Sequence, residues 1–160
     1  MIDERLIENI FSKLDKLNLL IATAESCTGG LIAHTLTNVS GSSNFFDRGI
    51  VTYSNRAKME LLGVSEEVLK QKGAVSHEVA KSMADGIRTK SKVHIGISTT
   101  GIAGPTGGTK EKPVGLVFIG ISTEKDAIVK KFQFSGDRTE NKENTCKEAL
   151  KMLYTLLDTW

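Results

Sequence analysis

Short apolar runs, each followed by a polar or glycine-rich segment, alternate along this chain with stretches of helical periodicity. The apolar runs predict strands at 19–25, 49–54, 93–99, 115–122 and 127–134. The periodic stretches predict helices at 3–16, 28–39, 56–63, 65–73, 76–91 and 135–159. Because helices separate the early strands, we expect these strands to pair in parallel and the last two to form a hairpin. The pattern predicts a three-layer α/β/α fold around a mixed, mostly parallel sheet of about five strands.

The length and charge narrow the class of protein. A chain of 160 residues fits a single domain covering 1–160. Its formal net charge is only +2, and the lysines near the C-terminus are interspersed with glutamates, which argues against a nucleic-acid partner. The charged, amphipathic N-terminus is no signal peptide, and no apolar run reaches the roughly 20 residues of a membrane helix. We therefore expect a cytoplasmic protein with no membrane partner.

The cysteines and histidines do not indicate a metal site. Cys27 and Cys146 are too few for a disulfide scaffold and lack a metal-binding spacing. The histidines His34, His77 and His94 fall on different predicted elements, without an HxH or HExxH pattern. Nothing in the sequence favours a Ser-His-Asp triad, which these residues would form only by long-range contact.

Polar segments follow several of the predicted strands. They are residues 24–30, 53–58 and 99–108. Ligands of open α/β sheets bind at the carboxyl ends of the strands, where such segments converge. This edge of the sheet is therefore the predicted functional site.

The stretch TAESCTGG places Ser26 between a predicted strand and a predicted helix. The backbone N–H groups of Thr28, Gly29 and Gly30 would be free there to bind an anion or a developing oxyanion. Ser26 is then either a nucleophile or an ordinary helix N-cap, for which serine is a favoured residue. Cys27 is an alternative nucleophile, although a lone cysteine is more often a small core residue.

Lys58 is the candidate base. It falls in the first turn of a predicted helix that begins near Asn55, where the macrodipole disfavours a cation and helps to lower its pKa. A lysine with a lowered pKa can accept the proton of a serine hydroxyl. The alternative is a solvated surface lysine, which is the usual state of a single lysine.

Other polar segments have two interpretations each. The loop 100–115 contains five glycines and two prolines but lacks the P-loop and GxGxxG patterns, so it is a backbone-donor loop at most. Residues 42–44 either contact a ligand or form a turn. Arg138 either binds a phosphate or carboxylate, or pairs with Asp137 or Glu140 at the start of the last helix.

The segments TAESCTGG, SGSSNFFDRGIVTYSNRAK, GAVS, TGIAGPTGG, KPVG and FSGDR occur in this order. In these motifs the chain resembles the CinA C-terminal domain family, which includes free-standing nicotinamide mononucleotide amidohydrolases of the PncC type. The resemblance covers about residues 4 to 159 of this chain. It does not extend to the additional N-terminal domain of the larger CinA proteins. It implies hydrolysis of the nicotinamide mononucleotide carboxamide to nicotinate mononucleotide and ammonia, without a metal or other cofactor. It also implies a homodimer with a small-molecule nucleotide as its partner.

The resemblance also implies which residues act. Ser26 and Lys58 would form the catalytic pair, and Tyr53 would orient Lys58 or relay its proton. The substrate-binding residues would be Ser43, Thr28, Gly29, Gly30, Thr100, Gly101, Ala103, Gly104 and Arg138. Ser43 remains a competing candidate for the nucleophile. A non-catalytic nucleotide-binding module linked to competence or DNA damage, and an amidase for another carboxamide, are the alternative functions.

Overall fold

The structure is a computed structural model that describes residues 2–160. Its centre is one five-stranded sheet with the order β2-β1-β3-β4-β5. The strands are β1 (Ile21–Glu25), β2 (Phe46–Val51), β3 (Ile95–Gly101), β4 (Leu116–Ser122) and β5 (Ala127–Gln133). β1 pairs in parallel with β2 and β3, whereas β4 is antiparallel to both of its neighbours, so β4 alone in this sheet runs in the opposite direction. The predicted mixed sheet is confirmed.

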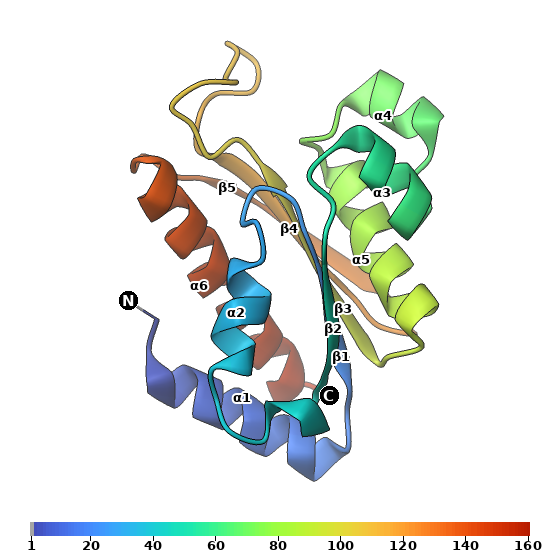
Figure 1. The fold of residues 1–160 in the computed structure, drawn as a ribbon, viewed down its shortest axis with the longest axis vertical. Coiled ribbons are helices and arrows are strands. Elements are labelled where there is room, and N and C mark those ends of the chain that lie inside the picture. Colours follow the sequence, from blue (N-terminus) through green and yellow to red (C-terminus); the bar gives the residue numbers. More distant parts are fainter. Residues whose placement is uncertain (1) are drawn as a thin grey trace.

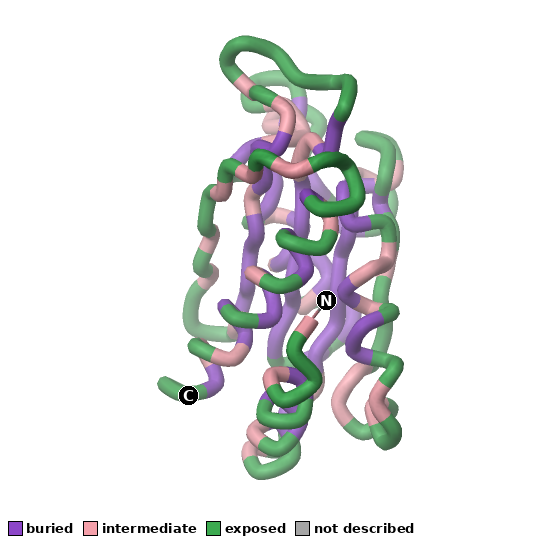
Figure 2. The backbone as a smooth tube through the Cα atoms, turned by 90° about the vertical axis from the view of Figure 1, so that its left-hand side faces the viewer, coloured by how far each residue is buried: buried purple, intermediate pink, exposed green. Residues whose placement is uncertain are grey.

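Helices cover both faces of the sheet (Figure 1). One face carries α1 (Glu4–Leu17), α2 (Leu31–Thr37) and α6 (Arg138–Asp158). The other face carries α3 (Asn55–Leu62), α4 (Glu66–Lys72) and α5 (His77–Ser91). Each face has its own buried apolar cluster, and Figure 2 shows the buried strands between the more exposed helices. The three-layer architecture is therefore as predicted.

The helices after β2 begin where the sequence places their caps. The side chains of Ser54, Ser65 and Ser76 each accept a hydrogen bond from a backbone N–H in the first turn of α3, α4 and α5. Gly63 ends α3 in the left-handed conformation, with φ +71°, which glycine adopts without a Cβ clash. These caps fix the first residues of α3, and Lys58 with them.

Two predicted elements are displaced. The strand predicted at 49–54 spans Phe46–Val51, because Thr52 already donates to the Glu25 carbonyl beyond the ladder and Ser54 caps the next helix. The helix predicted at 28–39 begins only at Leu31 and is not capped by Ser26 or Thr28. The cause lies at the site, where another side chain caps this helix.

Candidate active site

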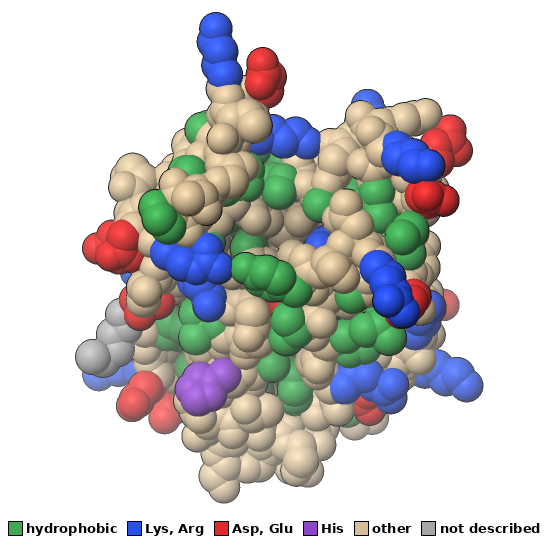
Figure 3. Space-filling model, turned by 45° about the horizontal axis from the view of Figure 1, so that its top comes forward, with side chains coloured by type: hydrophobic (Ala, Val, Ile, Leu, Met, Phe, Trp, Pro, Cys, Tyr) green, Lys and Arg blue, Asp and Glu red, His purple; other side chains and the backbone are tan. Residues whose placement is uncertain are grey.

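The carboxyl ends of β1 and β3 open onto a pocket of about 220 Å³. Its walls come from the turn after β1, the start of α3, the segment after α4, the end of β3 with the following loop, and the start of α6. The lining residues are Ser26, Cys27, Tyr53, Asn55, Lys58, Ala74, Val75, Thr100, Gly101, Ala103 and Arg138. Figure 3 shows this end of the molecule, hollowed between the long loop and the α3–α4 region. All three predicted polar segments therefore contribute to one pocket.

Ser26 and Lys58 both line this pocket and contact each other there. Lys58 Nζ lies 3.1 Å from Ser26 Oγ, within hydrogen-bond distance. The two residues are 32 positions apart in the sequence and lie on different elements, β1–α2 and α3. The fold therefore brings together the predicted nucleophile and the predicted base.

The environment of Lys58 favours its neutral form. Its side chain is only 1% exposed, so the surface-lysine alternative is wrong. Besides Ser26 it donates to the backbone carbonyls of Thr52 at 3.0 Å and Tyr53 at 3.4 Å, and within residues 2–160 it has no carboxylate partner. Burial lowers the pKa of Lys58 from its ordinary value. A neutral amine beside a serine hydroxyl is able to accept its proton.

A buried carboxylate builds the turn that carries Ser26. Glu25 is 1% exposed, and its oxygens accept from the backbone N–H groups of Gly30, Ile32 and Ala33 and from the hydroxyl of Thr28. The N-terminus of α2 is thus capped from the end of β1, and the negative carboxylate lies at the positive end of the helix. This cap explains why α2 starts three residues later than predicted.

The same cap corrects the predicted anion site. The N–H of Gly30 donates to Glu25, and that of Gly29 donates to the Ser26 carbonyl. The hydroxyl of Thr28 is also engaged, with Glu25 and with Thr99. Gly29 and Gly30 therefore shape the turn, with φ of +62° and +98°, but do not offer free donors to a ligand.

Other backbone donors near the pocket remain free. Among residues 2–160, no hydrogen bond to another residue uses the N–H groups of Cys27, Thr28, Ala103 or Gly104. Cys27 follows the serine directly, and both Cys27 and Ala103 line the pocket. These groups are suitable donors for an oxyanion that forms near Ser26.

Tyr53 and Arg138 form the outer wall of the pocket. Arg138 donates to the Tyr53 hydroxyl at 2.9 Å and to the Gly104 carbonyl at 2.7 Å. Arg138 makes no salt bridge with Asp137 or Glu140, so the capping-pair interpretation is wrong. Tyr53 contacts Lys58 through its carbonyl, while its hydroxyl points to Arg138. Tyr53 therefore links the base to the rim of the pocket.

The end of β3 has a structural role in the pocket. The Thr100 hydroxyl donates to the Ala74 carbonyl at 2.7 Å and so ties the segment after α4 to the sheet. At Gly101 a Cβ would lie 2.6 Å from the Val117 side chain, so only glycine fits beside β4. The loop beyond is anchored by Asn141, whose amide donates to the Ala103 carbonyl at 3.0 Å.

Cys27 is unsuited to act as the nucleophile. Its side chain lines the pocket but is buried, and burial raises the pKa of the thiol to about 12. At neutral pH the residue is therefore a thiol, which is a much weaker nucleophile than a thiolate.

Ser43 is not brought to this pocket within the chain. It lies in the short 3-10 helix η1 (Ser42–Asn44), which directly precedes β2. The first residue of β2 pairs with Ile21 at the start of β1, whereas Ser26 follows the end of β1. Ser43 therefore lies near the amino ends of these parallel strands, whereas Ser26 lies at their carboxyl ends.

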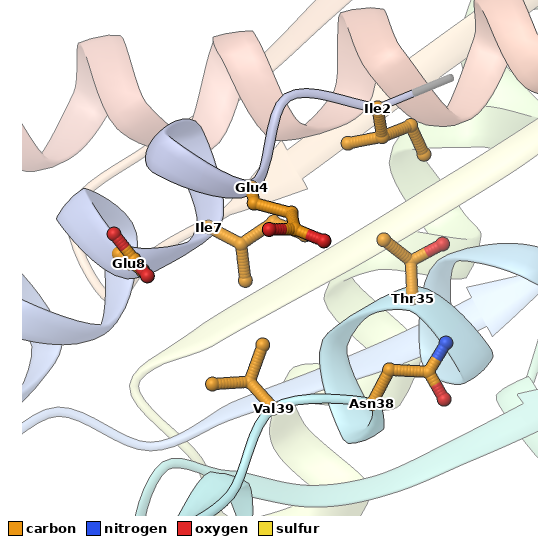
Figure 4. A pocket seen from close by; sticks show the side chains of 7 residues that line it. All are labelled: Ile2, Glu4, Ile7, Glu8, Thr35, Asn38 and Val39. Carbon is orange, nitrogen blue, oxygen red and sulfur yellow. The ribbon is translucent and has the colours of Figure 1, made fainter.

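A second hollow, of about 360 Å³, lies between α1 and α2 (Figure 4). It is lined by Ile2, Glu4, Ile7, Glu8, Thr35, Asn38 and Val39. The Thr35 hydroxyl donates a hydrogen bond to the Leu31 carbonyl. The residues that line this hollow include neither a lysine nor a histidine that could act as a base. This hollow is larger than the pocket at Ser26 but has no nucleophile with a base beside it.

Residues 2–160 contain neither a cluster of metal ligands nor a helix that could span a membrane. No group of three or more His, Cys, Asp and Glu side chains is placed to hold a metal ion. None of the helices combines the length and the apolar character needed to cross a membrane.

Two residues that organise the site were missed in the sequence. Glu25 belongs to the TAESCTGG motif, but its role depends on where α2 begins, which the pattern misplaces. Asn141 falls on the inner side of α6, is 1% exposed, and also bonds both backbone groups of Gly136. No sequence signal shows this role, because the burial of Asn141, which makes its amide need partners, is a property of the fold.

The fold and the site together define an α/β domain with a buried serine–lysine pair at the carboxyl edge of its sheet. Residues 3–157 match the CinA C-terminal domain family, and the chain belongs to this family. The chain is 56% identical over 151 residues to a protein from Caldicellulosiruptor saccharolyticus named as competence-damage inducible. That match covers 94% of this chain and 37% of the relative, so the chain spans little more than a third of this relative's length.

Solved structures of the same family have the same fold. A CinA superfamily protein from Klebsiella pneumoniae superposes with a TM-score of 0.94 at 31% identity, covering 98% of both chains. A competence/damage inducible protein from Agrobacterium tumefaciens superposes with a TM-score of 0.92 at 40% identity, covering 99% of this chain and 98% of the other.

Proposed function

We propose that this domain hydrolyses the carboxamide of nicotinamide mononucleotide to nicotinate mononucleotide and ammonia, with Ser26 as the nucleophile and Lys58 as the base. The observation that carries the proposal is the buried contact of 3.1 Å between Lys58 Nζ and Ser26 Oγ. A lysine without an acidic partner is a costly group to bury, and such groups are concentrated at functional sites. The substrate follows from the resemblance of the motifs to the amidohydrolases of this family.

The first half of the reaction forms an acyl-enzyme. Ser26 Oγ attacks the carboxamide carbon while Lys58 Nζ accepts the hydroxyl proton. The free N–H groups of Cys27 and Ala103 stabilise the resulting oxyanion. The carbon–nitrogen bond then breaks, and the Lys58 ammonium returns its proton to the leaving nitrogen, which departs as ammonia.

The second half restores the enzyme. Lys58, again neutral, takes a proton from a water molecule that attacks the ester carbon. The ester bond to Ser26 breaks, the serine recovers its proton from Lys58, and the carboxylic acid product loses its remaining proton to solvent and leaves as the carboxylate. The same amine thus serves both steps.

The test is ammonia release from nicotinamide mononucleotide by the chelator-treated protein. We expect Ser26→Ala, Lys58→Ala and Lys58→Arg to lower kcat by about 10³-fold or more, since arginine cannot accept a proton. Lys125→Ala is the matched control, because Lys125 is an exposed lysine in the turn between β4 and β5. Ser43→Ala is expected to retain the acyl-enzyme on Ser26, as detected by mass spectrometry.

Two results would contradict the proposal. An acyl group trapped on Ser43 would exclude Ser26 as the nucleophile. Binding of the nucleotide without ammonia release by the wild type would favour the non-catalytic nucleotide-binding module.

A further inference from the structure

A second cation lies beside the turn that carries Ser26. Lys142 follows Arg138 by four residues on α6, and residues at this spacing share one face of a helix. A Cβ on Gly29 would lie 3.5 Å from Lys142 Nζ, which places the ammonium directly against the turn. Because Gly29 has no side chain, the ammonium is able to approach the backbone there.

The charges of these two cations are not compensated. Within residues 2–160, neither Lys142 nor Arg138 forms a salt bridge. The acidic residues at the start of α6, Asp137 and Glu140, bond to each other's backbone N–H groups in a capping box. Arg138 bonds only to neutral oxygens of Gly104 and Tyr53. Two cations without an acidic partner therefore lie on α6, Arg138 at the pocket itself and Lys142 against the turn that carries Ser26.

The turn itself cannot bind an anion at the start of α2. That helix end is occupied by the Glu25 carboxylate, which takes the N–H groups of Gly30, Ile32 and Ala33. An anionic group of a ligand at Ser26 is therefore not bound by this helix terminus, and Arg138 and Lys142 are the cations that the neighbouring helix α6 offers. A single carboxylate needs one cation, whereas a phosphate monoester carries up to two negative charges and suits a pair.

We infer that Lys142, together with Arg138, binds the phosphate of a phosphomonoester substrate, and that Lys142 determines the preference for a nucleotide over its nucleoside. The inference rests on the proposed function for the identity of the substrate. Arg138 lies at the rim of the Ser26 pocket and also lines an adjoining hollow of about 500 Å³. The carboxamide would thus lie at Ser26 and Lys58 while the phosphate lies at the surface of α6.

The experiment compares nicotinamide mononucleotide with nicotinamide riboside, which lacks the phosphate. Lys142→Met removes the charge but keeps an unbranched apolar side chain, and Lys142→Arg keeps the charge. We expect Lys142→Met to raise KM for the mononucleotide about tenfold with kcat unchanged, as for the loss of one charged contact. The preference for mononucleotide over riboside should fall by the same factor, and Lys142→Arg should restore most of it.

Lys147→Ala is the matched control, because Lys147 is exposed on α6 and has no salt bridge within the described chain. Calorimetric binding of both compounds to the same proteins separates this inference from the proposed function. If the wild type binds the mononucleotide more tightly than the riboside but releases no ammonia, and Lys142→Met loses that preference, the phosphate site stands and the activity fails. If the wild type releases ammonia and Lys142→Met keeps the full preference for the mononucleotide, the inference about Lys142 is overturned.

Discussion

Replacing Lys58 with methionine separates the catalytic and energetic consequences of burying this amine. The substitution keeps an unbranched side chain in the same space but removes the group that accepts and binds protons. We expect it to abolish turnover. We also expect it to remove a pH dependence of folding stability that the wild type must carry.

The sign and size of that dependence follow from the burial of one amine. Burial lowers the pKa of Lys58 in the folded protein, whereas in the unfolded chain it returns to about 10.4. Between these two values the unfolded state binds more protons, so the wild type becomes more stable as the pH rises. For a single proton the free energy of unfolding rises by at most about 1.4 kcal/mol per pH unit in this window.

The assay is urea unfolding of wild type and Lys58→Met between about pH 6 and about pH 10, below the ordinary pKa of lysine. The free energy of unfolding of the wild type should rise relative to that of the variant as the pH increases through the window. Lys125→Met is the control, since Lys125 is exposed and its substitution should leave the pH dependence unchanged. If the free energy of unfolding of the wild type, relative to that of Lys58→Met, stays constant or falls with rising pH, Lys58 is not buried as a neutral amine.

Further substitutions test the cap, the packing of α5 and the rim. Glu25→Ala leaves several donors of the α2 start without a partner, so urea unfolding should show a loss of about 3 kcal/mol; wild-type stability would contradict this role. Gly86→Ala would place a Cβ 2.1 Å from the Leu62 carbonyl oxygen, so α3 and α5 would have to move apart. Thermal unfolding should show a loss of about 2–3 kcal/mol in the free energy of unfolding, and an unchanged value would contradict this close packing. Tyr53→Phe removes the acceptor of an Arg138 hydrogen bond, so kcat/KM should fall about threefold to tenfold. Because Tyr53 is 62% exposed, the free energy of unfolding of the Tyr53→Phe variant should differ from that of the wild type by less than about 0.5 kcal/mol.

The fold was largely predictable because its signals are local. The serine caps at Ser54, Ser65 and Ser76 precede periodic apolar residues, and each helix begins where its cap predicts. The errors arose where a long-range contact overrides a local signal. Glu25 caps α2 from the end of a strand, so neither Ser26 nor Thr28 is needed as the cap and the helix starts later.

The site was predictable only in part. The polar segments that follow β1 and β3 converge because parallel strands end at the same edge, a consequence of topology alone. The burial of Lys58 was not predictable, because it depends on carbonyls of Thr52 and Tyr53 that face inward only after β2 has ended. Likewise, no local pattern shows that Asn141 holds the loop at Ala103.

The buried cap of α2 has a consequence for how this site can diversify. In many α/β proteins the helix after the first strand binds the ligand's phosphate, so a change of ligand disturbs the fold itself. Here that position is occupied by the Glu25 side chain, and the exposed Arg138 and half-exposed Lys142 lie on the surface of a different helix. Residues on that surface can be exchanged at little cost in stability. Selectivity for the distal part of a substrate can therefore evolve, or be engineered, while the Ser26–Lys58 pair and the sheet beneath it stay unchanged.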